Sequence, residues 1–251
     1  NTQITNYHMH IGLVIYGSLD TQSGGYLYDR KLMEYLRAQG HTIEIVSLAW
    51  RGYWRHVGDN FSADLRQHLR TADFDILIQD ELNHPSLVLL NQQLQNQLPY
   101  PCLTLVHHLR CTEKRAHWKN LLYRQIEKQY LKSVDGYIFN SDTTRCEVEK
   151  LIGRAHPHTI AFPAADHLPD QDDPLALNLP DKILRNAPLR LLFVGNVIPR
   201  KGLHTLLRAL EHVPPQRWKL DIVGSLETNL YYALAMQRQV AQSPWKEQVR
   251  F

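Results

Sequence analysis

The stretch LLFVGNVIPRKGLHTLLRAL, residues 191–210, holds a strand, a loop and a helix in succession. Its first four residues form a short apolar run, which is typical of a buried strand. Leu203, Leu206, Leu207 and Leu210 then recur at the i, i+3, i+4, i+7 spacing of one helix face. A strand followed directly by an amphipathic helix predicts one unit of a parallel sheet.

The same alternation continues on both sides of this stretch. Apolar runs predict strands at residues 11–16, 42–48, 74–78, 102–106, 137–139, 159–162, 191–194, 220–223 and 249–251. Helical spacing predicts helices between them, including one in which Trp118, Leu122, Ile126 and Tyr130 form an apolar stripe. The pattern predicts the α/β class, with a doubly wound, Rossmann-like parallel sheet covered by helices on both faces.

Residues 163–188 interrupt this pattern with five prolines and five aspartates, which is the composition of a linker. We therefore predict an N-terminal Rossmann-like domain at residues 1–165, a linker at 166–188 and the first part of a second Rossmann-like domain at 189–251. The last region holds too few strands and helices to cover both faces of a sheet. We expect a truncated second domain with an apolar sheet edge that pairs with another copy or with further residues.

Composition excludes several classes of protein. With 43% hydrophobic and 9% aromatic residues the chain is not disordered, and no apolar run is long enough to span a membrane. Residues 189–251 hold nine Lys/Arg against four Asp/Glu, which suits a phosphorylated small molecule better than a nucleic acid. The three cysteines lack the spacing of a disulfide framework or a zinc site, which favours a reducing, cytoplasmic setting.

Two candidate sites follow strands in the first half of the chain, where a parallel sheet binds its ligands. Ser23-Gly24-Gly25 follows the first strand and opens a helix, so its backbone could approach a diphosphate. Alternatively, the two glycines are present only because the loop needs residues that adopt positive φ. His107 and His108 follow the strand 102–106 and could bind a sugar hydroxyl or act as a base, or could be structural.

Two further candidates carry charge. Arg200 and Lys201 lie between a strand and a helix N-terminus, a place suited to phosphate oxygens, although a solvated charge pair is the alternative. Glu81, with His84, is a weaker candidate because loop carboxylates are usually only solvated. No G-x-G-x-x-G follows the first strand, and no Walker A, G-x-S-x-G or H-E-x-x-H motif occurs.

Taken in order, these motifs resemble family 4 glycosyltransferases, which have the GT-B fold. Ser23-Gly24-Gly25 with a following helix and Gly40-His41 resembles the opening of that family, and Val106-His107-His108 resembles its histidine after the fourth strand. Asn140-Ser141 before a helix resembles its N-S turn. The segment 193–203 is the most specific part, because it resembles the opening of the family's second domain.

The resemblance implies a role for each matching residue. Gly24 and Gly25 would line the donor diphosphate, and His107 would contact the donor sugar as the catalytic histidine, with His108 the less favoured of the pair. Arg200 and Lys201 would hold the donor diphosphate from the second domain. The family is retaining and needs no bound metal or other cofactor.

The chain departs from the family pattern in three places. Asn196 stands where the family usually has an arginine, so any contact from this residue to the diphosphate is uncharged. Ala164-Ala165 replaces the usual Asn-Gly. The family's E-x7-E region would lie beyond Phe251.

The expected function is transfer of a hexose-like sugar from a UDP-, GDP- or ADP-sugar to an unidentified acceptor. We expect this stretch alone to be inactive. Two alternatives stay open: a nucleotide-sugar epimerase of GT-B fold, and a binding module that has lost catalysis. Peripheral membrane contact also stays open.

Overall fold

The computed structural model describes residues 7–113, 116–153, 157–163 and 188–251. Contacts divide the chain into two compact units, Asn1–His167 and Leu168–Phe251. The predicted linker at 166–188 lies outside the described residues except for Pro188.

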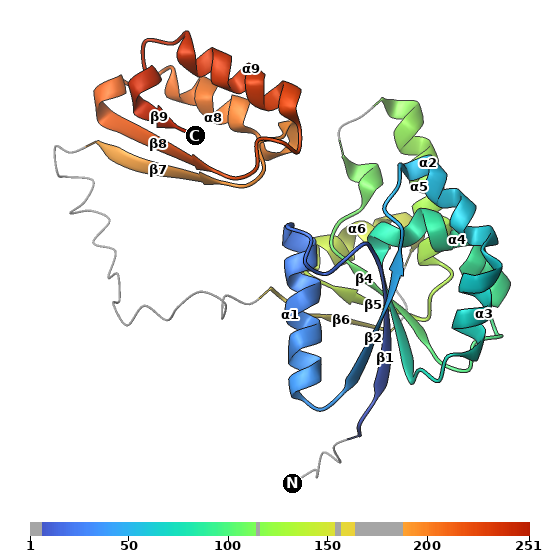
Figure 1. Cartoon of the computed structure of the whole chain (residues 1–251). Coiled ribbons are helices and arrows are strands. Elements are labelled where there is room, and N and C mark those ends of the chain that lie inside the picture. Colours follow the sequence, from blue (N-terminus) through green and yellow to red (C-terminus); the bar gives the residue numbers. More distant parts are fainter. Residues whose placement is uncertain (1–6, 114–115, 154–156, 164–187) are drawn as a thin grey trace. The chain divides into compact units, whose positions relative to one another are not determined.

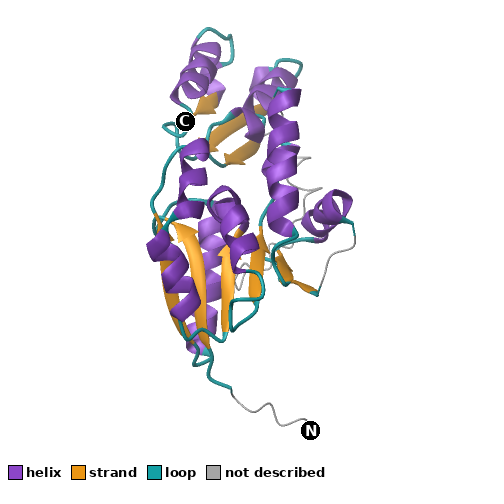
Figure 2. Cartoon of the chain, turned by 90° about the vertical axis from the view of Figure 1, so that its right-hand side faces the viewer, coloured by secondary structure: helices purple, strands orange, loops and turns teal. Residues whose placement is uncertain are grey.

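The first unit is built on a six-stranded, fully parallel sheet in the order β2-β1-β3-β4-β5-β6 (Figure 1). Its strands are β1 (His10–Tyr16), β2 (Thr42–Leu48), β3 (Ile76–Asp80), β4 (Cys102–Val106), β5 (Gly136–Phe139) and β6 (His158–Ile160). Its helices are α1 (Gly24–Ala38), α2 (Tyr53–His56), α3 (Ala63–Thr71), α4 (His84–Leu94), α5 (His117–Leu131) and α6 (Asp142–Ile152). Helices lie on both faces of the sheet (Figure 2), which confirms the predicted fold class.

The sheet has two apolar faces because side chains alternate along each strand. Ile11, Leu13 and Ile15 of β1 pack with Tyr26 and Met33 of α1 on one face. The neighbouring residues of β1 enter a second, larger core on the opposite face. Burial on both faces explains why β1 reads as a continuous apolar run.

The predicted stripe on α5 is only half correct. Tyr130 is fully buried, whereas the side chains of Trp118 and Leu122 are 59% and 45% exposed. The sheet and α4 cover only the C-terminal half of the helix, so the apolar spacing continues past the core. The last predicted strand of this unit is also too long, because β6 ends at Ile160.

The second unit is a three-stranded parallel sheet in the order β7-β8-β9. Its elements are β7 (Leu189–Val194), α8 (Leu203–Leu210), β8 (Trp218–Val223), α9 (Leu230–Ala241) and β9 (Val249–Arg250). Trp218, Leu220 and Ile222 of β8 pack with both helices on one face. On the other face, within the described residues, Leu192 and Val194 are 65% and 69% exposed, consistent with the expected one-sided sheet.

Candidate functional site

The candidate site lies at the carboxyl edge of the first sheet. The strand order reverses direction between β1 and β3, and in open α/β sheets this switch point is where ligands bind. Tyr16, Asp80 and Val106 end the strands that meet there. The residues that follow them supply most of the candidates predicted for the first domain.

Gly24 and Gly25 form the first turn of α1, after the N-cap Ser23, whose hydroxyl accepts the N–H of Tyr26 at 3.2 Å. Neither glycine has positive φ, so the idea that this turn needs a left-handed residue is wrong; the chain makes that turn at Gly17. A Cβ on Gly25 would lie 3.4 Å from the ring of His107, whereas one on Gly24 would meet nothing within 4 Å. Gly25 therefore matters because the imidazole lies against it.

His107 is held by a buried acid on α1. Its Nε2 donates to Oδ1 of Asp29 at 2.8 Å, and Asp29 is fully buried. Burial alone would lower the pKa of His107, but the hydrogen bond and negative charge of Asp29 raise it above its usual value. Among the described residues nothing lies within hydrogen-bond distance of Nδ1. A protonated His107 therefore keeps one N–H for a ligand.

Asp80 lies beneath this pair at the end of β3. Ligand atoms of Asp29, Asp80 and His107 all lie within 4.8 Å of one another. Burial, and then the charge of Asp29, raise the pKa of Asp80 to about 8. A proton on Asp80 relieves the repulsion between these two buried acids. The same spacing would admit a cation, although His107 Nε2 is already paired with Asp29.

His108 has a different setting from its neighbour. Its Nε2 lies 2.9 Å from Oε1 of Glu113, and half of its side chain is exposed. His108 does not line the cleft that opens beside His107.

Glu81 and His84 are not in a solvated loop, so that expectation is wrong. Both are buried, and their ligand atoms lie within 4.8 Å of those of Glu127 on α5. Glu127 accepts the backbone N–H groups of Arg110 and Cys111. Burial raises the pKa values of Glu81 and Glu127 to about 7. The cluster thus anchors the turn that follows His107 and His108.

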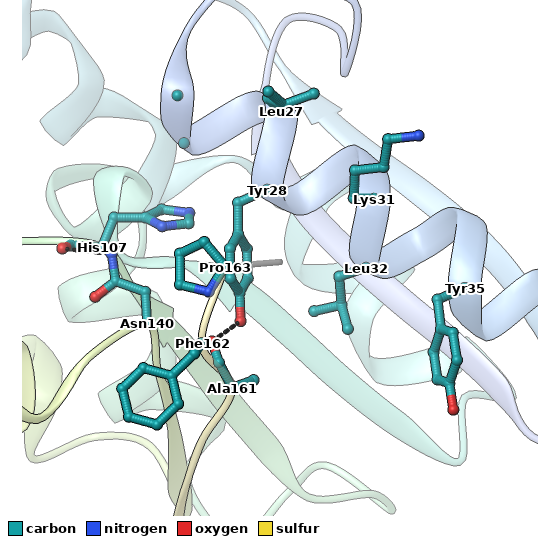
Figure 3. Close-up of a pocket in the computed structure, with 12 residues that line it drawn as sticks. Leu27, Tyr28, Lys31, Leu32, Tyr35, His107, Asn140, Ala161, Phe162 and Pro163 are labelled. Atoms are coloured by element: carbon teal, nitrogen blue, oxygen red, sulfur yellow. Dashed lines mark hydrogen bonds between the residues drawn. The ribbon is translucent and has the colours of Figure 1, made fainter. Parts of the chain in front are cut away.

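A cleft of about 360 Å³ opens beside His107 (Figure 3). It is lined by Gly24, Gly25, Leu27, Tyr28, Lys31, Leu32, Tyr35, His107, Asn140, Ala161, Phe162 and Pro163. The hydroxyl of Tyr28 donates to the carbonyl of Ala161 at 2.7 Å and ties α1 to the chain after β6. The cleft is mainly apolar; His107 and Asn140 lie toward one end, and Lys31 and the hydroxyl of Tyr35 lie toward the other (Figure 3).

In the second unit, the candidates lie on the loop after β7. Arg200 and Lys201 are exposed, Asn196 is half-buried, and the alkyl chain of Lys201 passes over Gly195. A Cβ on Gly224 would lie 2.1 Å from the carbonyl oxygen of Gly195, so only glycine allows this approach at the ends of β7 and β8. The loop that carries both cations is thus positioned by two backbones in contact.

The structure brings Gly24, Gly25 and His107 together at one cleft, and it separates His108 and Glu81 from that cleft. Sequence reasoning missed Asp29 and Asp80. One signal was available for Asp29: it stands between Gly25 and Met33 on the inward face of α1, where an acid needs a buried partner.

None of the helices in the described part of the chain is both long and apolar enough to cross a membrane.

No protein-family model matches the chain, and neither does any curated protein. Solved structures do match, at low identity. Sucrose-phosphate synthase from Thermosynechococcus elongatus is 16% identical with a TM-score of 0.70, over 97% of this chain and 70% of that one. HepE of Anabaena, solved with UDP and glucose, is 17% identical with a TM-score of 0.62, over 97% and 69%.

Trehalose 6-phosphate synthase from Burkholderia multivorans matches with a TM-score of 0.56 and 11% identity, over 97% of this chain and 71% of that one. At such identities the likeness shows the fold and nothing finer. The parallel sheets of both units and these neighbours lead to one conclusion, that the chain has the GT-B fold.

Proposed function

We propose that the chain binds a nucleotide sugar as part of a metal-independent, retaining glycosyltransferase of the family 4 type. The observation that carries this proposal is the contact between the His107 ring and Gly25 at the N-terminus of α1, at the switch point of a GT-B sheet. HepE, which shares the fold, has been solved with UDP-glucose. The family 4 motifs in the sequence support the finer assignment.

Sugar transfer breaks the anomeric C–O bond and leaves negative charge on the diphosphate, so donors fixed in advance do most of the catalytic work. The N–H groups of Gly24 and Gly25 suit phosphate oxygens. Asp29 raises the pKa of His107, and the protonated ring offers its second N–H to the donor. Arg200 and Lys201 supply the remaining positive charge, because Asn196 has none to give.

Donor binding tests the proposal directly. UDP-glucose, GDP-mannose and ADP-glucose are titrated by calorimetry in EDTA, and one of them should bind and raise the melting temperature. Free ligand at about 100 times Kd should add ~2.7 kcal/mol to the free energy of unfolding. Lys201→Ala should weaken this binding about tenfold, as should His107→Gln, each through loss of a charge-assisted hydrogen bond.

His108→Gln is the matched control, because His108 pairs with Glu113 and does not line the cleft. If none of the three nucleotide sugars binds, or if binding requires Mg²⁺, the proposal is wrong. Hydrolysis or epimerisation of the bound sugar without an acceptor would favour the epimerase.

A further inference from the structure

The N-terminal half of α5 carries apolar side chains that the core does not cover. Trp118, Leu121 and Leu122 are 59%, 52% and 45% exposed. Their i, i+3, i+4 spacing places them on one face of the helix, and the opposite face is buried through Tyr123 and Glu127. These three residues form what we call the Trp118 patch. Exposed apolar residues grouped in this way mark an interaction surface.

Cations border the Trp118 patch. Lys119 and Arg124 lie on the same two helical turns, both exposed, and the ammonium of Lys119 lies 5.4 Å from the ring centroid of Trp118. Among the described residues no carboxylate lies within ion-pair distance of either. The one acid in residues 116–131 is Glu127, which is buried under the helix.

The neighbouring helix α2 carries a second exposed tryptophan, on the side of α5 that Tyr123 faces and not on the Trp118 patch. The ring of Trp54 lies 6.0 Å from that of Tyr123 on α5, so the two helices lie side by side here (Figure 1). Trp54 is 54% exposed, and Arg55 beside it is exposed as well. Residues 50–58 contain no acid.

We infer that the Trp118 patch, with Lys119 and Arg124 beside it, docks on an anionic lipid surface. Tryptophan with leucine, bordered by Lys and Arg, is the composition of helices that lie in a membrane interface. Each cation near an anionic surface strengthens binding about fivefold. The inference does not depend on the proposed function.

Vesicle sedimentation tests the inference. The 251-residue chain is mixed with vesicles of phosphatidylglycerol and phosphatidylcholine in equal parts, or of phosphatidylcholine alone, at 0.1 M NaCl. We expect at least about tenfold tighter binding to the anionic vesicles, weakened at 0.5 M NaCl by screening. The double variant K119Q/R124Q should weaken binding about 25-fold, and the variant W118S should do so about tenfold.

Matched controls come from the second unit. The substitutions R238Q and K246Q remove two exposed cations there, and Y231S removes an aromatic ring that is 91% exposed. These variants should bind as the wild type does. Brominated lipid should quench the tryptophan fluorescence of the wild type and much less that of W118S, a readout that does not depend on the amount sedimented.

Equal binding to both kinds of vesicle, or patch variants that bind as the controls do, would overturn the inference. A concentration-dependent dimer that W118S dissociates and anionic lipid does not would instead assign the patch to contact between copies.

Discussion

Two clusters at the carboxyl edge of the first sheet have the same composition and opposite behaviour. Asp29, Asp80 and His107 form one, and Glu81, His84 and Glu127 form the other. Each has two acids and one imidazole, and Asp80 and Glu81 are adjacent in the chain. His107 is 17% exposed at the cleft and has a raised pKa, whereas burial lowers the pKa of His84 to about 4.

The hydrogen bonds explain the difference. Nδ1 of His84 donates to the carbonyl of Glu81 at 2.9 Å and also lies 3.0 Å from Oε1 of that residue. Nε2 lies 2.8 Å from the hydroxyl of Tyr53, so both nitrogens of this buried ring have protein partners. His107 has a carboxylate on one side and the cleft on the other. Residue type alone therefore does not separate a histidine that faces the cleft from one that protein groups enclose. The partners of the second ring nitrogen do.

The largest effect that would sharpen this comparison is the loss of Glu127. Glu127→Ala leaves two buried backbone N–H groups without an acceptor, which should lower the free energy of unfolding by about 3 kcal/mol. Glu127→Gln, which keeps one acceptor, should cost about 1 kcal/mol. Urea denaturation at pH 7 measures both. Equal losses would show that the N–H groups do not depend on this side chain.

Exchanging each histidine for glutamine tests the division of roles. His84→Gln should lower the free energy of unfolding by about 2 kcal/mol, because an amide does not reproduce both ring hydrogen bonds, and should leave donor affinity unchanged. His107→Gln keeps an N–H for Asp29 but loses the ring nitrogen that faces the cleft, so it should weaken donor binding about tenfold and change stability by less than about 1 kcal/mol. Calorimetric titration and urea denaturation separate the two effects. If both variants lose donor affinity, or if both lose stability by the same amount, the two histidines do not have different roles.

Glu81 and Glu127, in the cluster with His84, predict that the free energy of unfolding depends on pH. Burial raises the pKa values of Glu81 and Glu127 from 4.5 to about 7, so the folded state binds more protons between these values. The stabilisation from both groups is present below pH 4.5 and is lost as pH rises towards 7. The shift of His84 from 6.5 to about 4 acts in the opposite sense, since its stabilisation is lost as pH falls from 6.5 to 4.

Glu127→Gln removes one raised carboxyl. Between pH 5 and pH 8 its free energy of unfolding should therefore fall by about 2 kcal/mol less than that of the wild type, because the shift from 4.5 to about 7 acts over most of this range. Denaturation at the two pH values measures this difference. If the free energies of unfolding of the two proteins change with pH by the same amount, the pKa of Glu127 is not raised in the folded state.

The smallest effect concerns the two glycines of α1. Gly24→Ala meets nothing within 4 Å, and Gly25→Ala meets the His107 ring at ordinary contact distance. Both should gain about 0.5 kcal/mol of stability, because alanine favours a helix. Only Gly25→Ala narrows the approach to His107, so only this variant should weaken donor binding, about threefold. Thermal melts with and without nucleotide sugar distinguish them, and equal affinities would remove Gly25 from the site.

Local patterns in the sequence predicted most of the strands and helices. The strands 42–48 and 102–106 coincide with β2 and β4, and the helix expected after Asn140-Ser141 is α6, which Ser141 caps. The failures were elements whose environment is set by distant residues. Trp118 and Leu122 fit a helical stripe, yet nothing in their own spacing shows that the core ends at Tyr123.

The sequence by itself determined the α/β alternation, the capped helix starts and the place of Gly24, Gly25 and His107 after their strands, because these depend on residues close together in the chain. Only the tertiary structure decided which side chains face each other. Asp29 and His107 are 78 residues apart, and they meet because parallel strands bring their carboxyl ends to one edge. The same packing buries Glu81 and His84 against α5. Burial there raises the pKa of Glu81 and lowers the pKa of His84.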